Sequence, residues 1–157
     1  NPIPVSGITS INNNLEWSEN FQTWVIKGFL FSEGKLVTDP PGTPKPDITI
    51  SNDGTLENLI LQTNNYHDSF YKAGEYIDAT SAEQAFEALT SFTFPPWESW
   101  AFSIKPNQIW IFRTSAEKFA KFRIISTISE VRETKDYAEC TFEWVYQPDG
   151  SLTFPGK

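Results

Sequence analysis

Residues 109–125, with the sequence IWIFRTSAEKFAKFRII, and residues 140–147, CTFEWVYQ, decide the fold class of this chain. β-Branched and aromatic residues dominate both stretches, and polar residues recur with a period of two, which is typical of strands that bury one face. The polar residues of 115–118 separate two such segments. We therefore predict antiparallel strands over 109–114, 119–125 and 140–147, with a polar gap before the last.

The sequence upstream predicts further short strands joined by turns. The expected segments are a hairpin of 23–31 with 35–37, a hairpin of 47–51 with 56–61, and a strand over 101–105. Ser32-Glu33-Gly34 and Asn52-Asp53-Gly54 supply the two turns. Residues 39–46 contain four prolines, which cannot donate to a ladder, and predict a stiff surface loop. Residues 64–77 show no steady period and also predict a loop.

One helix is predicted over about 81–90. Ser81 is its expected N-cap, with Gln84 three residues later as in a capping box. Four apolar residues recur at helical spacing and share one face: Ala82, Ala85, Phe86 and Leu89.

Together these elements predict a mainly β fold, an antiparallel meander closed as a sandwich or a barrel-like fold, with one short α-helix. The 157 residues form a single β-rich domain in this interpretation, with 1–20 as an N-terminal arm. We expect Ile8, Leu15 and Trp17 to tie this arm to the domain.

The composition narrows the functional classes. A net charge of −8 argues against binding to nucleic acid and to anionic lipid. The chain has 13 Phe, 6 Trp and 5 Tyr, and most of these rings are expected in the core. Cys140 stands alone and alternates with Phe142 and Trp144, so we expect a small buried side chain rather than a reactive thiol.

No catalytic constellation is visible. His67 is the one histidine, Met is absent, and no Gly-x-Ser-x-Gly elbow, phosphate-binding Gly-rich motif or His-Glu-x-x-His motif occurs. We predict that the chain is not an enzyme and has no catalytic or metal-binding residues, although His67 could act as a lone ligand.

Three cations near the closing strands form one candidate ligand site. Arg113, Lys121 and Arg123 fall on one face if the turn pairs the strands over 109–114 and 119–125. They would either anchor a carboxylate-bearing ligand or form ion pairs with Glu143 and nearby carboxylates.

Aromatic residues in loops form two more candidates. Trp97 and Trp100, with Phe92 and Phe94, lie in a proline-stiffened segment, where rings could stack on a sugar or a planar ligand or could fix the loop to the core. The second group is Tyr66, His67 and Tyr71.

The closing strands resemble the HmuY-like family of bacterial surface proteins from the Bacteroidota. The resemblance lies in 110–114 (WIFRT), 119–121 (FAK), 123–125 (RII) and 142–151 (FEWVYQPDGS), and it extends over about 101–154. It implies a mostly β fold with a helix, a haem or porphyrin ligand, and a non-enzymatic binding role. Haem in this family is commonly held by two His or Met side chains, whereas this chain contains one His and no Met.

We therefore expect a secreted or surface-anchored protein that binds a small molecule or glycan. The resemblance implies an extracellular or cell-surface location, with a signal peptide removed ahead of residue 1 and an outer-membrane lipid anchor upstream. Two alternatives stay open: a carbohydrate-binding module that uses the loop Trp residues, and a self-assembling structural subunit that exchanges the arm over 3–15 with a neighbour.

Overall fold

Strands dominate the computed structural model, which describes residues 2–40, 44–52 and 55–155. The fold is mainly β with one helix, as predicted. The strands are β1 Ser6–Asn12, β2 Leu15–Ser18, β3 Thr23–Leu30, β4 Lys35–Asp39, β5 Thr49–Ser51, β6 Ile60–Gln62, β7 Phe70–Glu75, β8 Ala101–Phe102, β9 Gln108–Arg113, β10 Phe119–Arg132 and β11 Lys135–Gln147. The helix, α1, spans Ala79–Ala88.

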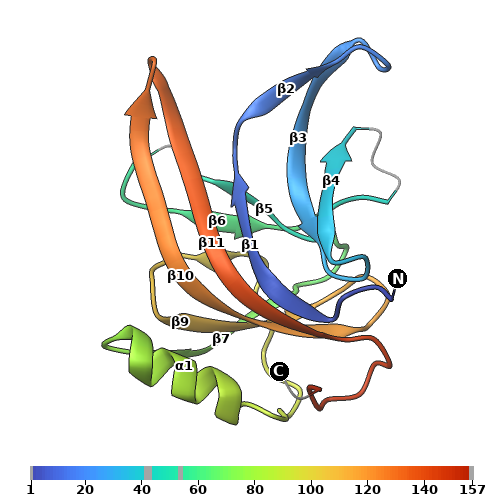
Figure 1. The fold of residues 1–157 in the computed structure, drawn as a ribbon, viewed down its shortest axis with the longest axis vertical. Coiled ribbons are helices and arrows are strands. Elements are labelled where there is room, and N and C mark those ends of the chain that lie inside the picture. Colours follow the sequence, from blue (N-terminus) through green and yellow to red (C-terminus); the bar gives the residue numbers. More distant parts are fainter. Residues whose placement is uncertain (1, 41–43, 53–54, 156–157) are drawn as a thin grey trace.

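The strands form three antiparallel sheets (Figure 1). The largest has the order β1-β11-β10-β9-β7, and the smaller ones are β2-β3-β4 and β5-β6-β8. β9, β10 and β11 form the predicted meander of consecutive hairpins. The described strands do not close into a barrel, so the sandwich is the observed alternative.

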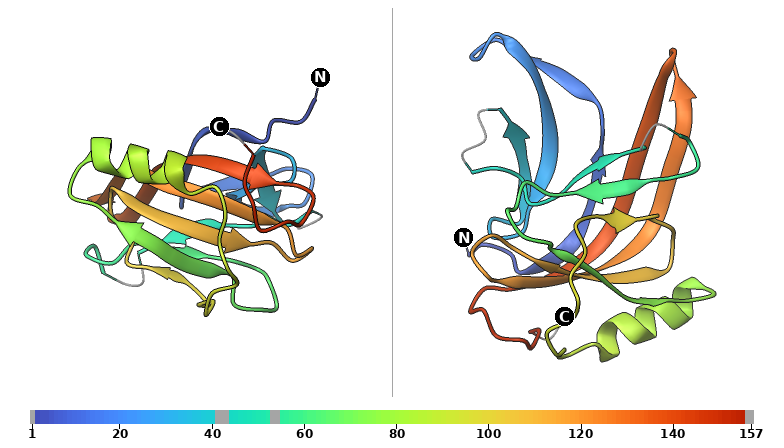
Figure 2. Two further views of the ribbon diagram at one scale, coloured as in Figure 1. Left: turned by 90° about the horizontal axis from the view of Figure 1, so that it is seen from below. Right: turned by 180° about the vertical axis from the view of Figure 1, so that it is seen from behind.

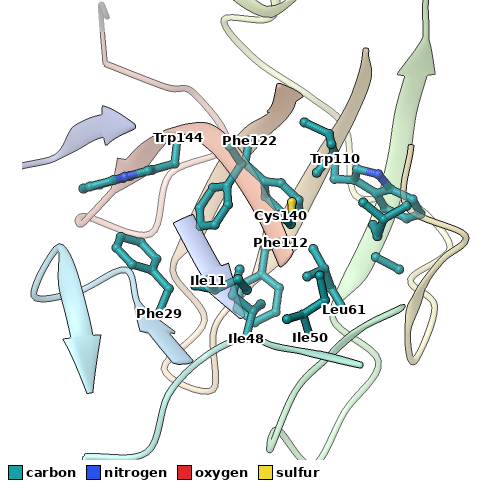
Figure 3. Packing of buried hydrophobic residues seen from close by; sticks show 14 of the residues in the cluster. Ile11, Phe29, Ile48, Ile50, Leu61, Trp110, Phe112, Phe122, Cys140 and Trp144 are labelled. Carbon is teal, nitrogen blue, oxygen red and sulfur yellow. The ribbon is translucent and has the colours of Figure 1, made fainter. Parts of the chain in front are cut away.

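The main core lies between the five-stranded sheet and strands β3, β5 and β6. Figure 3 shows Trp144, Phe122 and Phe112 of the large sheet facing Phe29, Ile48 and other side chains from the opposite layer. Cys140 is fully buried in this cluster, on the face that carries Phe142 and Trp144, as the alternation predicts.

The opposite face of the large sheet is covered by α1 and the C-terminal segment. Ile111, Phe119 and Val145 pack there against Phe86 of the helix and Phe154. The helical face is as predicted, with Ala82 and Phe86 buried and Ala85 and Leu89 partly buried. The predicted cap is wrong, because Asp78 is the N-cap and its carboxylate accepts from the backbone N–H of Ser81 at 2.8 Å.

The loop predicted over 64–77 contains a strand. β7 pairs with β9, and its register shifts between Lys72 and Gly74. This irregularity breaks the alternation of side chains on which the sequence-based prediction depended. The strand predicted over 101–105 is shorter than expected, since β8 covers Ala101–Phe102.

The predicted second hairpin is confirmed in its pairing, but its returning strand begins late. β5 and β6 pair antiparallel, and β6 starts at Ile60 rather than at residue 56. Residues 53–54 of its predicted turn, and residues 41–43 of the predicted proline-rich loop, lie outside the described residues.

The N-terminal arm is part of two sheets. β1 pairs with β11 of the same chain and β2 pairs with β3. The predicted anchors are wrong, because Ile8, Leu15 and Trp17 are 64%, 54% and 44% exposed. Ile11, which is 2% exposed, holds the arm to the core instead.

Two hairpins project from the end of the molecule opposite α1 (Figures 1 and 2). One consists of β2 and β3. The other is the outer half of β10 and β11, so the polar gap predicted before residue 140 is wrong. Glu133 and Thr134 form its two-residue turn, with φ values of 51° and 73°. Because a turn of this kind is usually marked by Asn-Gly, the sequence carries little signal for it.

No helix among the described residues combines the length and the apolarity that a membrane crossing requires.

Candidate functional site

The three predicted cations lie on the face of the large sheet that α1 covers. Phe119 is paired with Arg113, Lys121 with Ile111, and Arg123 with Ile109, so the predicted shared face is confirmed. Lys121 and Arg123 are 2% and 6% exposed. Both are therefore out of reach of a ligand in this conformation.

Each cation has partners within the chain. Lys121 Nζ donates to the backbone carbonyl oxygens of Phe86 and Leu89, the latter at 2.9 Å. Arg123 Nη2 and Nε donate to Glu143 Oε1 at 3.0 and 3.2 Å, so the predicted ion pair is present. These contacts favour a structural role for Lys121 and Arg123.

Arg113 joins two of the other predicted residues. Its guanidinium carbon lies 5.1 Å from the ring centroid of Trp97. Its Nη1 lies 3.9 Å from Glu117 Oε1, and the same carboxylate oxygen lies 3.2 Å from Nε2 of His67. The structure thus brings Arg113, Trp97 and His67 to one end of the sheet, where Arg113 Nη2 also donates to the carbonyl oxygen of Asp68 at 2.7 Å.

The loop tryptophans differ in their surroundings. Trp97 is half-buried and stacks on Phe119, with ring centroids 6.1 Å apart and planes inclined by 13°. Trp97 thereby fixes the loop to the apolar residues on the face of the large sheet that α1 covers. Trp100 is 55% exposed and remains accessible.

The remaining predicted residues, Tyr66, His67 and Tyr71, also lie in different surroundings. Tyr66 is fully exposed, whereas Tyr71 is partly buried in β7 and packs against the cluster around Ile111. His67 Nδ1 lies 3.1 Å from Ser69 Oγ. The eight predicted residues therefore do not converge on a single site.

A cleft lies elsewhere, between the two projecting hairpins. It has a volume of about 980 Å³. Its walls come from the β1–β2 connection and β3 on one side and from the β10–β11 turn on the other: Asn13, Asn14, Leu15, Trp24, Arg132, Glu133, Lys135, Asp136 and Tyr137. We call this space the inter-hairpin cleft.

One wall of the inter-hairpin cleft is apolar and exposed. Trp24 is 57% exposed and Leu15 is 54% exposed. Trp24 is paired with Trp17 across β2 and β3, and their rings meet edge to face with centroids 5.5 Å apart. This contact orients the Trp24 ring without covering it.

The other wall combines an aromatic ring with charge. The Arg132 guanidinium carbon lies 3.7 Å from the Tyr137 ring centroid, and Arg132 Nε donates to Glu130 Oε2 at 2.6 Å. The Tyr137 hydroxyl donates to Glu139 Oε1 at 2.5 Å. Burial and the neighbouring Glu139 raise the pKa of Tyr137 above its ordinary value, so its phenol stays protonated at neutral pH.

The base of the cleft is held by one asparagine. Asn13 Nδ2 donates to the carbonyl oxygen of Asp136 at 2.9 Å, and Asn13 Oδ1 accepts from the N–H of Ala138 at 3.0 Å. The backbone N–H of Asn13 donates to the carbonyl oxygen of Ala138 at 3.1 Å. These bonds fix the β10–β11 hairpin to the start of the β2–β3 hairpin, so the two walls are positioned before any ligand arrives.

The sequence-based prediction did not include the cleft. Its two walls are more than a hundred residues apart in the chain, and nothing in one sequence indicates that they meet. Trp17 and Trp24 gave a weak indication of it. Both are large aromatic residues on paired strands, and neither belongs to the alternating apolar pattern of the core.

The lining of the inter-hairpin cleft includes Tyr137 but not His67, the residue considered as a lone haem ligand. Within the described ranges, no group of three or more His, Cys, Asp or Glu side chains is arranged to hold a metal ion. Trp24 presents an exposed ring to the cleft, whereas Tyr137 is 6% exposed and its ring is covered by Arg132. Imidazole coordination in the cleft does not fit the residues present.

No protein-family model matches the sequence, and no curated protein is significantly similar to it. The resemblance to HmuY-like proteins therefore stays a sequence-based prediction.

Proposed function

We propose that this chain is a non-enzymatic binding protein, secreted or anchored at the cell surface, whose ligand lies in the inter-hairpin cleft. The observation that carries the proposal is the exposure of Trp24 and Leu15 on one wall, opposite Arg132 and Tyr137 on the other. Exposed apolar side chains gathered in a cleft are a frequent mark of a binding site. The hairpins provide the rigidity that such a site needs.

The proposed ligand is planar and apolar, with an anionic edge. Trp24 offers a ring face. The rim carries two cations that suit the carboxylates of a ligand, Arg132 and Lys135, beside the acidic side chains of Glu133 and Asp136. A porphyrin has this chemistry, and the cleft volume of about 980 Å³ is at the upper end of the range for small-molecule sites. The HmuY-like resemblance supports the same ligand class.

The test is a titration with haem and with metal-free protoporphyrin, followed by tryptophan fluorescence and by the Soret band. We expect both ligands to bind, because stacking rather than an axial bond holds the ring. Trp24→Ala should weaken binding about tenfold or more, since it removes the principal ring contact. Trp100→Ala and His67→Ala are the controls and should bind as the wild type does.

The opposite pattern would count against the proposal. If His67→Ala abolishes the Soret change while Trp24→Ala leaves it intact, the ligand site is near Glu117 and not in the cleft. If neither porphyrin binds at all, the assignment of the ligand class is wrong.

The glycan alternative has one supporting observation, the exposure of Trp100 at 55% with Phe94 also at 55%. Oligosaccharide titrations of the wild type and of Trp100→Ala test it. Binding that is lost in Trp100→Ala and kept in Trp24→Ala would favour the carbohydrate-binding module.

A further inference from the structure

A second pocket lies away from the inter-hairpin cleft, next to the segment that leads into β5. Its volume is about 500 Å³. Its lining includes Lys45, Asp47, Asn65, Tyr66 and Tyr146. We call this space the amine pocket. It plays no part in the ligand binding proposed above.

Two buried polar side chains line the amine pocket. Asp47 is 6% exposed, and its Oδ2 accepts from the backbone N–H of Phe31 at 2.9 Å. Tyr146 is also 6% exposed. Among the described residues, no further hydrogen bond is made to the Asp47 carboxyl and none to the Tyr146 hydroxyl. The second oxygen of the Asp47 carboxyl and the Tyr146 hydroxyl are therefore available to a ligand in the pocket.

Asn65 contributes an acceptor to the lining. Asn65 Nδ2 donates to Ser69 Oγ and to the carbonyl oxygen of Arg113, each at 2.9 Å, so both amide hydrogens are used and its carbonyl oxygen remains. The Asp47 carboxylate is also an acceptor. An occupant that matches these oxygens must bring several hydrogen-bond donors.

The lining holds one acidic side chain, Asp47, and one basic side chain, Lys45. Asp47 makes no ion pair with any described residue, and Lys45 is exposed. The ring of Tyr66 is fully exposed, where it can face a cation. The net charge of −8 attracts cations to the surface in general.

We propose that this pocket binds the primary ammonium group of a small amine, with the Asp47 carboxylate as its counter-ion and Tyr146 as a second hydrogen-bond partner. An –NH₃⁺ group offers three donors and no acceptor, which complements the lining. Binding requires the ionised carboxylate. Burial raises the pKa of Asp47 to about 7, opposed in part by the hydrogen bond from Phe31, so affinity rises from pH 6 to pH 8.

The test is an NMR titration of the ¹⁵N-labelled protein with n-butylamine at pH 8, with n-butanol as the uncharged control and sodium chloride as the ionic control. The reporter is the amide of Phe31, which is bonded to Asp47. We expect butylamine to shift this resonance saturably and the two controls to leave it in place. Asp47→Asn should weaken binding about tenfold or more.

Glu57→Gln removes one exposed carboxylate elsewhere and is the matched control, expected to bind as the wild type does. If Asp47→Asn fails to fold, Tyr146→Phe and the pH profile of the wild type keep the test decisive. Tyr146→Phe should bind more weakly, and affinity should fall about tenfold per pH unit well below pH 7.

An unmoved Phe31 resonance would overturn the proposal, as would an equal response to butanol or to sodium chloride. Equal losses of butylamine affinity in Asp47→Asn and Glu57→Gln would show that only the overall charge matters. This result would also overturn the proposal. Porphyrin binding in Asp47→Asn should match the wild type, so failure of this proposal and failure of the cleft proposal are distinguishable.

Discussion

The buried ammonium group of Lys121 donates a hydrogen bond of 2.9 Å to the carbonyl oxygen of Leu89, at the C-terminal end of α1. Nζ also donates to the backbone carbonyl oxygen of Phe86 and lies 4.3 Å from the centroid of the Phe86 ring. The last carbonyl groups of a helix lack partners in the helix and carry partial negative charge. Lys121 therefore joins α1 to the middle of the large sheet.

Lys121→Met should destabilise the protein by about 1–3 kcal/mol, because it leaves buried helix carbonyls without their donor. Denaturant unfolding measures the loss, and hydrogen exchange should show faster opening of the last turn of α1. Lys35→Met is the control, since Lys35 forms an exposed ion pair with Glu33 and should change stability by less than about 0.5 kcal/mol. Equal effects of the two substitutions would contradict the role of Lys121.

Arg123 and Glu143 form a buried ion pair, with side chains 7% and 10% exposed. Arg123→Met should cost about 3–5 kcal/mol, because Glu143 then loses a partner that compensates its buried charge. The double variant Arg123→Met/Glu143→Met should be more stable than Arg123→Met alone, since no uncompensated charge remains. Denaturant unfolding of the single and double variants measures this coupling, and additive losses would argue against it.

Asp47 should make the stability of the protein depend on pH. Its pKa is raised to about 7 in the folded state from an ordinary value of 3.8, so the folded state holds a proton that the unfolded state releases. The free energy of unfolding therefore falls from about pH 4 to pH 7 through this group and is constant above. Asp47→Asn keeps the acceptor for Phe31 and removes this dependence.

Unfolding measured at pH 5 and pH 8 tests this expectation. The stability of Asp47→Asn relative to the wild type should increase by roughly 2.5 kcal/mol between the two pH values. A difference that stays constant or changes in the opposite direction would show that Asp47 is ionised in the folded protein at pH 5.

Cys140 should be unreactive while the protein is folded. The side chain is fully buried, and burial raises the pKa of its thiol, so thiolate is scarce at neutral pH. We expect no reaction with a thiol reagent under native conditions and complete reaction in denaturant. Ser115→Cys introduces an exposed thiol that should react at once. Rapid labelling of Cys140 in the native wild type would contradict the placement of this strand in the core.

The sequence predicted the buried strands of the large sheet and missed strand segments that are mostly exposed. β9 and the adjoining part of β10 are rich in β-branched and aromatic residues because both of their faces are packed, one against the main core and the other against α1 and the C-terminal segment. The outer half of the β10–β11 hairpin is mostly exposed, so no hydrophobic period marks it. In β7 the register shift after Lys72 removes the period.

Among the predicted site residues, the three cations share a face as predicted, but two of them are buried. The alternation placed Arg113, Lys121 and Arg123 on one face, and the strand register confirms it. One sequence did not reveal that α1 would cover that face. The cleft around Trp24 and Tyr137 could not be predicted, because it depends on where the fold places two hairpins that are distant in the chain.

The most direct test of the central claim is to map protoporphyrin on the protein by NMR. The inter-hairpin cleft predicts that the largest amide shifts and intermolecular contacts fall on Leu15, Trp24 and the segment 132–137, and that they vanish in Trp24→Ala. Shifts centred on His67 and Glu117, or on Trp100, with the cleft resonances unmoved, would contradict the account.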